Sequence, residues 1–371
     1  MIEIPPDKRD QRHLHDALAA ALSQMPDPFA SRWAGQFEEN LSAYFGGVHA
    51  IAVSSGTTAL HTALACAGIG PGDDVLVPSL TVVMSAAPIL TAGARPVFVD
   101  SNPHTLDIDY QDAARRLTER TRAIMPVHLW GRMGDPAVLR DFADRHGLVV
   151  IEDACQAVGS SRDDMAAGTI GDYGAFSTKD GKILWSGEGG FLVTSDVTRA
   201  DLARAFRTHW QTPPSGQAPL SRAAANYRLA EPLAAIAALN AIHLPYLLSR
   251  RRAQTRRLLD RVAGLPGLTV LEPHPAERWN HYAPLLRIDL PEPRRLCERL
   301  AELHVPNSVG TFKLVPCDTR SAFATPGAAP CPGAAQVIDT ILAPILTDRD
   351  DEDSIDTQAL VIEKEVTAWT R

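Results

Sequence analysis

The amino-acid sequence predicts an α/β protein, in which a three-layer sandwich around a mostly parallel β-sheet is followed by a smaller C-terminal α+β domain. Between residues 50 and 195, short apolar runs alternate with segments of helical length. Such alternation is typical of a parallel sheet covered by helices on both faces. From about residue 265, strand and helix patterns mix without that alternation, which indicates a second, smaller domain.

The alternating segments can be assigned in chain order. Five apolar runs predict strands: AIAV (50–53), DVLVP (74–78), RPVFVD (95–100), RAIMPVH (122–128) and LVVIED (148–153). Helix-length patterns follow the first four runs, at 58–68, 82–93, 109–120 and 136–147. Because ligands of such sheets bind at the carboxyl ends of the strands, we expect the functional site there.

The second half of the chain begins with a segment rich in Pro, Gly and Ser (211–223), which predicts a loop. A long helix pattern follows at 233–264 and is interrupted near Pro245. These patterns predict four parts: an N-terminal segment (1–35), a large domain (36–225), a connecting long helix (226–260) and a small C-terminal domain (261–371).

Composition and charge exclude several classes of function. The net charge of -8 over 371 residues argues against binding to nucleic acid or to an acidic membrane. The most apolar stretch, 75–94, contains two prolines and several Ser and Thr residues, which is typical of a buried core rather than of a membrane span. The five dispersed cysteines form neither a metal knuckle nor a redox dithiol. Together with an N-terminus that lacks a signal-peptide pattern, they predict a cytoplasmic protein.

Two of the five lysines lie in one loop, FSTKDGKILWSGEGG (176–190). A lysine amine can form an imine once its pKa is lowered, whereas arginine cannot. The alternative is an ordinary solvated turn. Ser177 precedes Lys182 by five residues and a glycine-rich stretch begins five residues after it, so a hydroxyl and a close backbone approach are both available. Lys179 has no matching partners, and Lys182 is therefore the better candidate for an imine-forming amine.

Two further motifs lie where strands are predicted to end. In SSGTTALHTAL (54–64), Gly56 allows a tight turn into a helix whose free amides can bind an anion, although an ordinary helix cap is an equally good interpretation. In VVIEDACQAVG (149–159), Asp153 ends an apolar strand and Gln156 follows three positions on. A buried carboxylate needs a partner, either an arginine or a cationic ring nitrogen.

In combination, these groups match what pyridoxal phosphate requires. A helix start holds the phosphate, an aspartate keeps the pyridine nitrogen protonated, and a lysine carries the aldehyde.

The sequence resembles the DegT/DnrJ/EryC1/StrS family of pyridoxal-phosphate-dependent sugar and cyclitol aminotransferases, within the aspartate-aminotransferase fold type I. The likeness runs from about residue 35 to the C-terminal helix. It is supported by VSSGTTALHTAL, GIGPGDDVLVPSLT, GARPVFVD, RTRAIMPVHLWG, VVIEDACQAVG, GDYGAFS, GEGG and ANYRLAEPLAAI.

The resemblance implies a role for each matching residue. Lys182 forms the Schiff base with the cofactor, Asp153 pairs with the pyridine nitrogen and Gln156 lies beside the ring. The phosphate is held by Gly56, Thr57, Thr58 and Ser177. The resemblance also implies a homodimer, because Asn226 matches an asparagine that reaches the phosphate of the neighbouring subunit.

Three departures from the family pattern bear on the substrate. Val82 stands where the family has an aromatic residue that stacks on the cofactor ring, so the stacking is aliphatic or another aromatic such as Trp185 replaces it. The usual His-Gly pair is His209-Trp210. The segment 305–323 lacks the usual Pro-Leu-His pattern.

The resemblance implies an aminotransferase that takes an amino group from L-glutamate or L-glutamine, passes through the pyridoxamine phosphate form, and donates it to a keto group of a sugar nucleotide, cyclitol or related small metabolite. By analogy, the setting is secondary-metabolite (antibiotic) biosynthesis. Two alternatives stay open. One is a sugar dehydratase or deoxygenase on the same fold, although the family's 3-dehydratases have His where this chain has Lys182. The other is a regulatory relative that binds the cofactor without turnover.

Overall fold

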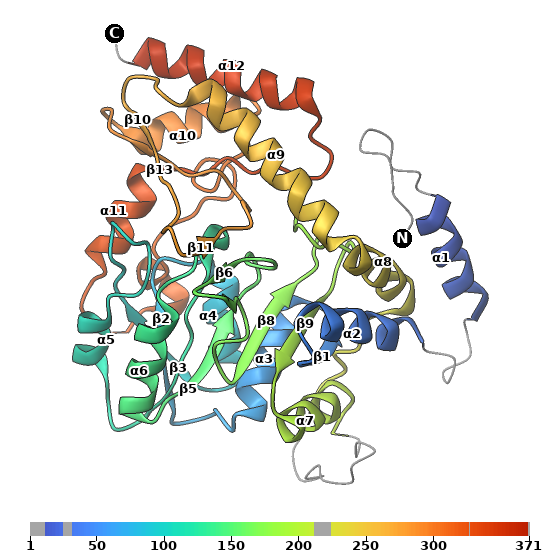
Figure 1. The fold of residues 1–371 in the computed structure, drawn as a ribbon. Coiled ribbons are helices and arrows are strands. Elements are labelled where there is room, and N and C mark those ends of the chain that lie inside the picture. The colour runs from blue at the N-terminus through green and yellow to red at the C-terminus, as the bar shows by residue number, and fades with distance from the viewer. Residues whose placement is uncertain (1–11, 25–31, 211–223, 326, 370–371) are drawn as a thin grey trace.

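The predicted α/β sandwich with a mostly parallel sheet is confirmed by the computed structural model, which describes residues 12–24, 32–210, 224–325 and 327–369 (Figure 1). The loop predicted at 211–223 lies outside the described residues. A seven-stranded sheet has the order β1-β9-β8-β5-β4-β2-β3. Its strands are β1 (His49–Val53), β2 (Asp74–Pro78), β3 (Arg95–Val99), β4 (Thr121–Ile124), β5 (Val149–Asp153), β8 (Tyr173–Ser177) and β9 (Gly190–Thr194).

The five predicted strands correspond to β1 to β5, and their neighbours in the sheet explain the mixed topology. Strands β3, β2, β4, β5 and β8 pair in parallel. Strand β9 runs antiparallel to both β8 and β1. The carboxyl ends of the parallel strands therefore meet at one edge of the sheet, where ligands of such folds bind.

Side-chain alternation along the strands divides the core into two layers. In β1, Ile51 and Val53 belong to one buried cluster, whereas Ala50 and Ala52 belong to the other. The first cluster contains residues of α3 (Gly56–Cys66), α4 (Val83–Thr91) and α7 (Val197–Arg207). The second contains residues of α2 (Trp33–Tyr44), α5 (Tyr110–Arg116), α6 (Pro136–His146) and α8 (Glu231–Ile242). Both faces of the sheet are thus covered, which is why its strands are apolar throughout.

Local signals in the sequence explain where the helices begin and end. Helix α6 starts at Pro136, where the fixed φ suits a first helical position, and the Asp135 side chain accepts hydrogen bonds from two backbone amides of the first turn. The helix ends at Gly147, which has a φ of 62°. A left-handed residue at this position is easiest for glycine.

The C-terminal part combines a three-stranded antiparallel sheet with four helices. The sheet has the order β10-β12-β13, formed by Leu268–Val270, Leu286–Ile288 and Ile341–Leu342. The helices are α9 (Leu244–Val262), α10 (Pro293–Glu302), α11 (Pro332–Thr340) and α12 (Glu352–Trp369). In Figure 1, α12 lies along α9 at the end of the molecule farthest from α7.

The helix pattern after residue 226 forms two helices rather than one rod. Helices α8 and α9 are separated at His243 and bent by 72°, close to Pro245. No single helix among the described residues is long and apolar enough to cross a membrane, and the bent pair α8 and α9 meets that test only when both helices are taken together. Helix α1 (Arg12–Gln24) packs on α8.

Candidate active site

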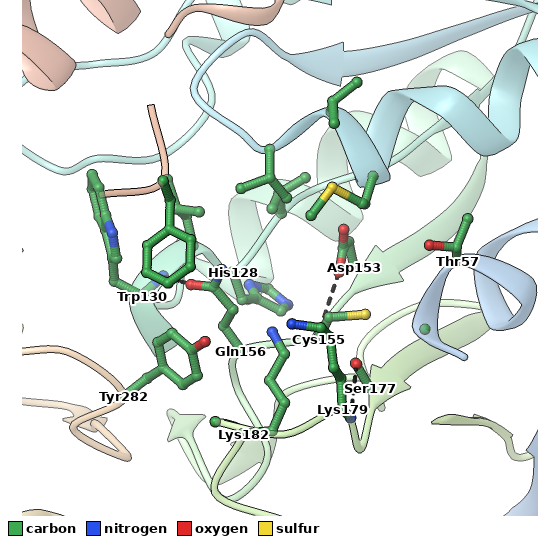
Figure 2. Close-up of a pocket in the computed structure, with 18 of the residues that line it drawn as sticks. Thr57, His128, Trp130, Asp153, Cys155, Gln156, Ser177, Lys179, Lys182 and Tyr282 are labelled. Atoms are coloured by element: carbon green, nitrogen blue, oxygen red, sulfur yellow. Dashed lines mark hydrogen bonds between the residues drawn. The ribbon is translucent and has the colours of Figure 1, made fainter. Parts of the chain in front are cut away.

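A cavity of about 350 Å³ lies at the carboxyl ends of the parallel strands. Its walls come from the start of α3, the start of α4, the segments after β4, β5 and β8, and several loops of the C-terminal part. Figure 2 shows that the side chains of Lys182 and Asp153 both line this space. Of the residues predicted from the sequence, those that line the cavity are Gly56, Thr57, Val82, Asp153, Gln156, Ser177 and Lys182.

The start of α3 forms one wall of the cavity. Ser55 caps the helix, accepting a hydrogen bond from the Thr58 amide at 3.1 Å, while its own amide donates to the Thr58 hydroxyl at 2.9 Å. A Cβ atom on Gly56 would lie 2.7 Å from Sγ of Cys155 and 2.8 Å from Cβ of Ser177. Only glycine therefore fits this turn. The first residues of the helix and Ser177 line the same part of the cavity, and backbone amides together with a hydroxyl are suited to binding an anion.

Asp153 ends β5 and is 4% exposed. Its Oδ2 accepts a hydrogen bond from Oγ of Ser85 at 2.6 Å, and its Oδ1 accepts one from the Cys155 amide at 3.1 Å. The Ser85 hydroxyl is itself within 2.7 Å of Oγ1 of Thr81. The sequence left open an ion pair between Asp153 and an arginine, and no such pair is found among the described residues. The carboxylate therefore lines the cavity and accepts hydrogen bonds only from neutral donors.

The two lysines of the glycine-rich loop occupy different environments. Lys179 is exposed at the edge of the cavity. Lys182 is partly buried, and its Nζ lies 5.1 Å from the centre of the Tyr282 ring. Burial lowers the pKa of Lys182, but Tyr282 and Asp153 outweigh burial and hold that pKa above its ordinary value. Burial also raises the pKa of the Cys155 thiol well above its ordinary value, which leaves this sulfur protonated and weakly nucleophilic.

Gln156 is held in place by the loop that follows β4. Its Oε1 accepts a hydrogen bond from the backbone amide of Trp130 at 2.7 Å. The Trp130 indole donates in turn to Oγ of Ser308 at 2.8 Å. Trp130 thereby joins the large sheet to the C-terminal part, although these segments are 178 positions apart in the sequence.

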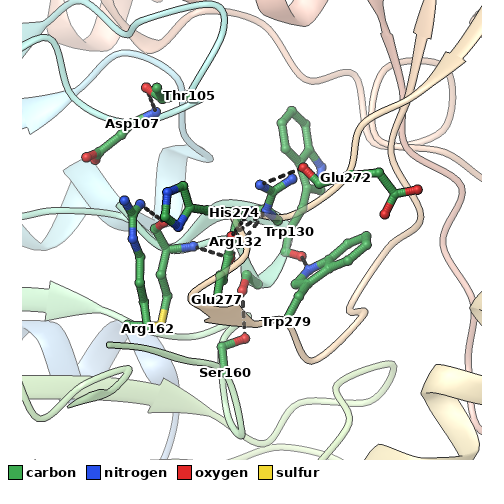
Figure 3. Close-up of polar contacts among 12 residues, drawn as sticks. Thr105, Asp107, Trp130, Arg132, Ser160, Arg162, Glu272, His274, Glu277 and Trp279 are labelled. Carbon is green, nitrogen blue, oxygen red and sulfur yellow. Dashed lines mark hydrogen bonds and ion pairs between the residues drawn. The ribbon is translucent and has the colours of Figure 1, made fainter. Parts of the chain in front are cut away.

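A set of polar contacts, shown in Figure 3, attaches the segment before Tyr282 to the same loop. Arg132 pairs with Glu277 at 3.1 Å. The Trp279 indole donates to the carbonyl of Trp130 at 2.8 Å. Glu277 belongs to the short strand β11 (Glu277–Arg278), which pairs with β6 (Ser161–Arg162), itself paired with β7 (Met165–Ala166). These contacts hold the segment that leads to Tyr282 against the loop that follows β4.

A buried pair lies behind the cavity wall. Nε2 of His128 is 2.9 Å from Oε2 of Glu152, which is fully buried. Glu152 also accepts hydrogen bonds from the backbone amides of Gly168, Ile170 and Gly171, at 2.8, 2.7 and 2.7 Å. His128 lines the cavity, so this network ties the cavity wall to the turn that precedes β8.

Replacing Glu152 with alanine leaves three backbone amides and one imidazole without their acceptor. We expect the free energy of unfolding to fall by about 3–5 kcal/mol, measured by urea denaturation. Glu302 is a matched control, because its ion pair with Arg299 is at the surface and surface pairs contribute at most about 1 kcal/mol. If the Glu152 variant unfolds at the same urea concentration as the Glu302 variant, this network does not stabilise the fold.

Two predicted residues do not line the cavity. The Thr58 side chain takes part in the helix cap of α3, and its place at the phosphate stays a prediction. Asn226 is exposed, and its Oδ1 accepts from the amide of Arg228 at 3.2 Å. Trp185, offered as a replacement for the missing ring-stacking aromatic, does not line the cavity either. Trp210 stands where the family usually has the glycine of the His-Gly pair. It is buried with a φ of 55°, a left-handed conformation that glycine adopts most easily.

The cavity residues that the sequence analysis missed include His128, Trp130, Tyr282 and Arg320. His128 ends the apolar run at 122–128 and Trp130 follows it, and this position at the end of a predicted strand was a usable signal. Tyr282 and Arg320 come from the C-terminal part, where no local pattern marks them.

The chain is similar to curated proteins that act on sugars and cyclitols. It is 44% identical over 182 residues to the GDP-perosamine synthase of Caulobacter vibrioides, and the matched region covers 49% of each chain. It is 40% identical over 189 residues to the L-glutamine:2-deoxy-scyllo-inosose aminotransferase of Streptomyces kanamyceticus, which covers 49% of this chain and 44% of the relative. The chain therefore matches about half the length of these relatives.

Among solved structures, DesV of S. venezuelae in complex with a ketimine intermediate superimposes with a TM-score of 0.82, at 29% identity over 96% of both chains. The profile of the DegT/DnrJ/EryC1/StrS aminotransferase family matches residues 29–360. Since this match spans the large sheet, the cavity and most of the C-terminal part, the chain belongs to the DegT/DnrJ/EryC1/StrS aminotransferase family.

Proposed function

We propose that this chain is an aminotransferase that moves an amino group from L-glutamate or L-glutamine to a keto group of a sugar nucleotide, a cyclitol or a related small metabolite, in secondary-metabolite biosynthesis. The observation that supports it best is the convergence of the Lys182 amine and the Asp153 carboxylate on one cavity at the start of α3. The similarity to a perosamine synthase and to a scyllo-inosose aminotransferase supports the substrate class.

Pyridoxal phosphate is the cofactor of the family to which the chain belongs, and the residues present fit it. The turn at Gly56 has no room for a side chain and brings helix amides together with Ser177, a suitable place for a phosphate. We propose that Gly56, Thr57 and Ser177 hold this phosphate, with Gln156 and Val82 beside the ring. Asp153 is the carboxylate that would face the pyridine nitrogen.

When bound, pyridoxal phosphate supplies an aldehyde that captures amines and a ring that accepts electrons. Lys182 would hold the cofactor through its Nζ until an amino donor takes its place. The free Nζ would then act as general base and acid, removing a proton at the α-carbon of the donor and holding it for return. Asp153, oriented by Ser85, would keep a proton on the ring nitrogen, because a carboxylate nearby favours the cationic form.

We also propose that the enzyme is a homodimer in which Asn226 reaches the neighbouring site. Asn226 is exposed and does not line its own cavity. Two apolar residues of the cavity, Met84 and Phe312, are 54% and 62% exposed, and a second copy would cover such side chains. We place the enzyme in the cytoplasm, since its five cysteines are all unpaired.

The pKa of Lys182 gives a prediction for cofactor binding. Because that pKa is raised, the amine is protonated at neutral pH, and only its neutral form attacks an aldehyde. The rate of covalent cofactor attachment to the apoprotein should therefore rise about tenfold per pH unit between about pH 7 and 9. In Tyr282→Phe the pKa falls, so attachment should be faster at each of these pH values. A rate in the wild-type protein that does not change with pH would contradict the raised pKa. The measurement is the absorbance change after mixing with pyridoxal phosphate.

The visible absorption spectrum of the purified protein tests the proposed function. We expect a yellow band that disappears on addition of L-glutamate or L-glutamine and returns with 2-oxoglutarate. A colourless protein that cannot be reconstituted would exclude the cofactor. A band that persists with every amino donor would instead favour a relative that binds the cofactor without turnover.

A further inference from the structure

Asn280 is a buried asparagine that does not line the cavity but contacts two residues that do. Its side chain is almost fully enclosed, since the residue is 1% exposed. Its Nδ2 donates to the backbone carbonyl of Gln156 at 2.8 Å, and its Oδ1 accepts from the backbone amide of Tyr282 at 2.9 Å. One side chain therefore joins the loop after β5 to the C-terminal part, across 124 positions in the sequence.

The amide group of Asn280 has one favourable orientation in this position. Its Nδ2 also donates to the carbonyl of Val158 at 3.0 Å, and the opposite orientation would place Oδ1 against two carbonyl oxygens. The backbone amide of Asn280 donates to Oγ of Ser160 at 3.1 Å, and that hydroxyl donates to the carbonyl of Gly131 at 2.6 Å. A Cβ atom on Gly131 would collide with Oδ1 of Asn280. The side chain is thus closely packed as well as hydrogen-bonded, which fixes its position.

The backbone of Tyr282 is held at both its amide and its carbonyl. The hydrogen bond from its amide to Asn280 closes a turn around His281, whose φ of 57° is left-handed. A left-handed φ is unfavourable for a residue with a Cβ atom, so it persists only where neighbouring contacts impose it. The carbonyl of Tyr282 accepts from Nη1 of the buried Arg251 at 3.0 Å. The turn at Asn280 therefore helps to decide where the chain places the Tyr282 ring.

Gln156 is held from the same segment at its carbonyl and at its side chain. Its carbonyl accepts from Asn280, as described above. Its Oε1 accepts from the amide of Trp130, and the carbonyl of Trp130 accepts from the Trp279 indole. Figure 2 shows Gln156 and Tyr282 in the same part of the cavity. A displacement of residues 279–280 would thus move both of these cavity residues together.

We propose that Asn280 is a positioning residue that couples Gln156 to Tyr282 and thereby sets the environment of the Lys182 amine. This inference rests on the proposed function, because it concerns the amine that carries the cofactor in that reaction. Asn280 acts on Lys182 through the Tyr282 ring, whose centre lies 5.1 Å from Nζ. It acts on the cofactor ring through Gln156.

The first readout is the pKa of Lys182 in the apoprotein, which needs neither cofactor nor turnover. The chain has only five lysines, so their signals can be followed by nuclear magnetic resonance with isotope-labelled lysine, and Lys182→Ala identifies the signal. Tyr282 raises this pKa, so we expect a lower pKa in both Tyr282→Phe and Asn280→Ala. The double variant should have the pKa of Tyr282→Phe alone, because substitutions that act through one contact are not additive.

The second readout is the visible band of the cofactor-loaded protein, which reports on Gln156 beside the ring. We expect the band maximum of Asn280→Ala to shift in the same direction as that of Gln156→Ala. Asn280→Ser keeps a hydroxyl that can donate to one carbonyl, and it should recover part of both effects.

Asn307→Ala is the matched control. Asn307 is fully buried, its Nδ2 donates to two backbone carbonyls at 2.8 and 3.1 Å, and its Oδ1 accepts from one backbone amide at 2.7 Å. It does not line the cavity. Because both alanine substitutions leave the same kinds of backbone group without a partner, both should lower the free energy of unfolding. Only Asn280→Ala should change the pKa of Lys182 and the visible band.

The outcomes separate the coupling from the proposed function. A wild-type pKa of Lys182 in Asn280→Ala, or a change of one readout without the other, would show that the coupling is wrong. It is equally wrong if the double variant has a lower pKa than Tyr282→Phe. If both Asn280 variants fail to fold or to bind the cofactor while Asn307→Ala succeeds, Asn280 only supports the fold and the coupling is again wrong. The proposed function fails if no amino donor changes the wild-type band, and the titration of the apoprotein then still decides the role of Asn280.

Discussion

Replacing Lys182 with alanine should remove covalent cofactor attachment and lower aminotransferase turnover by at least about 10³-fold. Two separate contributions are lost, the imine bond and the general acid and base, and the latter alone supplies about 10²–10⁴-fold. The measurement combines the absorption spectrum with the rate of the donor half-reaction in a single turnover. Added cofactor should still bind to the variant without a covalent bond, because the turn at Gly56 and the hydroxyl of Ser177 are unchanged.

Lys179→Ala provides the matched control, because it removes an amine only three residues away in the same loop. Lys179 is exposed, whereas Lys182 points into the cavity (Figure 2). The control should retain covalent attachment, and its rate should stay within about threefold of the wild-type rate, as is usual for exposed positions. Normal turnover in the Lys182 variant, or loss of attachment in the Lys179 variant, would reverse the assignment.

Asp153→Asn should lower the rate of the donor half-reaction by about 10²–10³-fold, the effect typical of losing one preorganised electrostatic contact. The substitution keeps the shape of the side chain and removes the charge that holds a proton on the ring nitrogen. Covalent attachment through Lys182 should persist, so the spectrum still shows a loaded site while the reaction slows. The readout is the single-turnover rate at saturating donor.

Ser85→Ala tests whether the position of that charge matters. The hydroxyl of Ser85 donates to Oδ2 of Asp153 at 2.6 Å, and its loss leaves the carboxylate in place with one donor fewer. We expect a smaller loss of rate, on the order of tenfold, consistent with a single hydrogen bond to a charged group. If Asp153→Asn reacts at the wild-type rate, the carboxylate has only a structural role.

The residues that local patterns predicted share a physical basis. Apolar runs separated by helix-length segments require a covered sheet, and a parallel sheet places the ends of its strands at one edge. Gly56 comes shortly after β1, Asp153 ends β5 and Ser177 ends β8, so the topology brings them to one cavity. Thr58 has an equally local role, because the start of a helix needs a cap and its hydroxyl serves that purpose.

The remaining features depend on contacts between distant segments, which no window of the sequence contains. Trp130 meets Ser308 across 178 positions, and Ser79 meets Asp318 across 239. The placing of Tyr282 and Arg320 in the cavity follows from such contacts. Local propensity and periodicity therefore sufficed for β1 to β5, for the helices between them and for the residues at their ends, whereas β8 and β9 were not predicted as strands. The part of the cavity wall that comes from the C-terminal part could not be predicted in this way. It depends on how the C-terminal part packs against the sheet, and side-chain shape and hydrogen-bond geometry decide that packing.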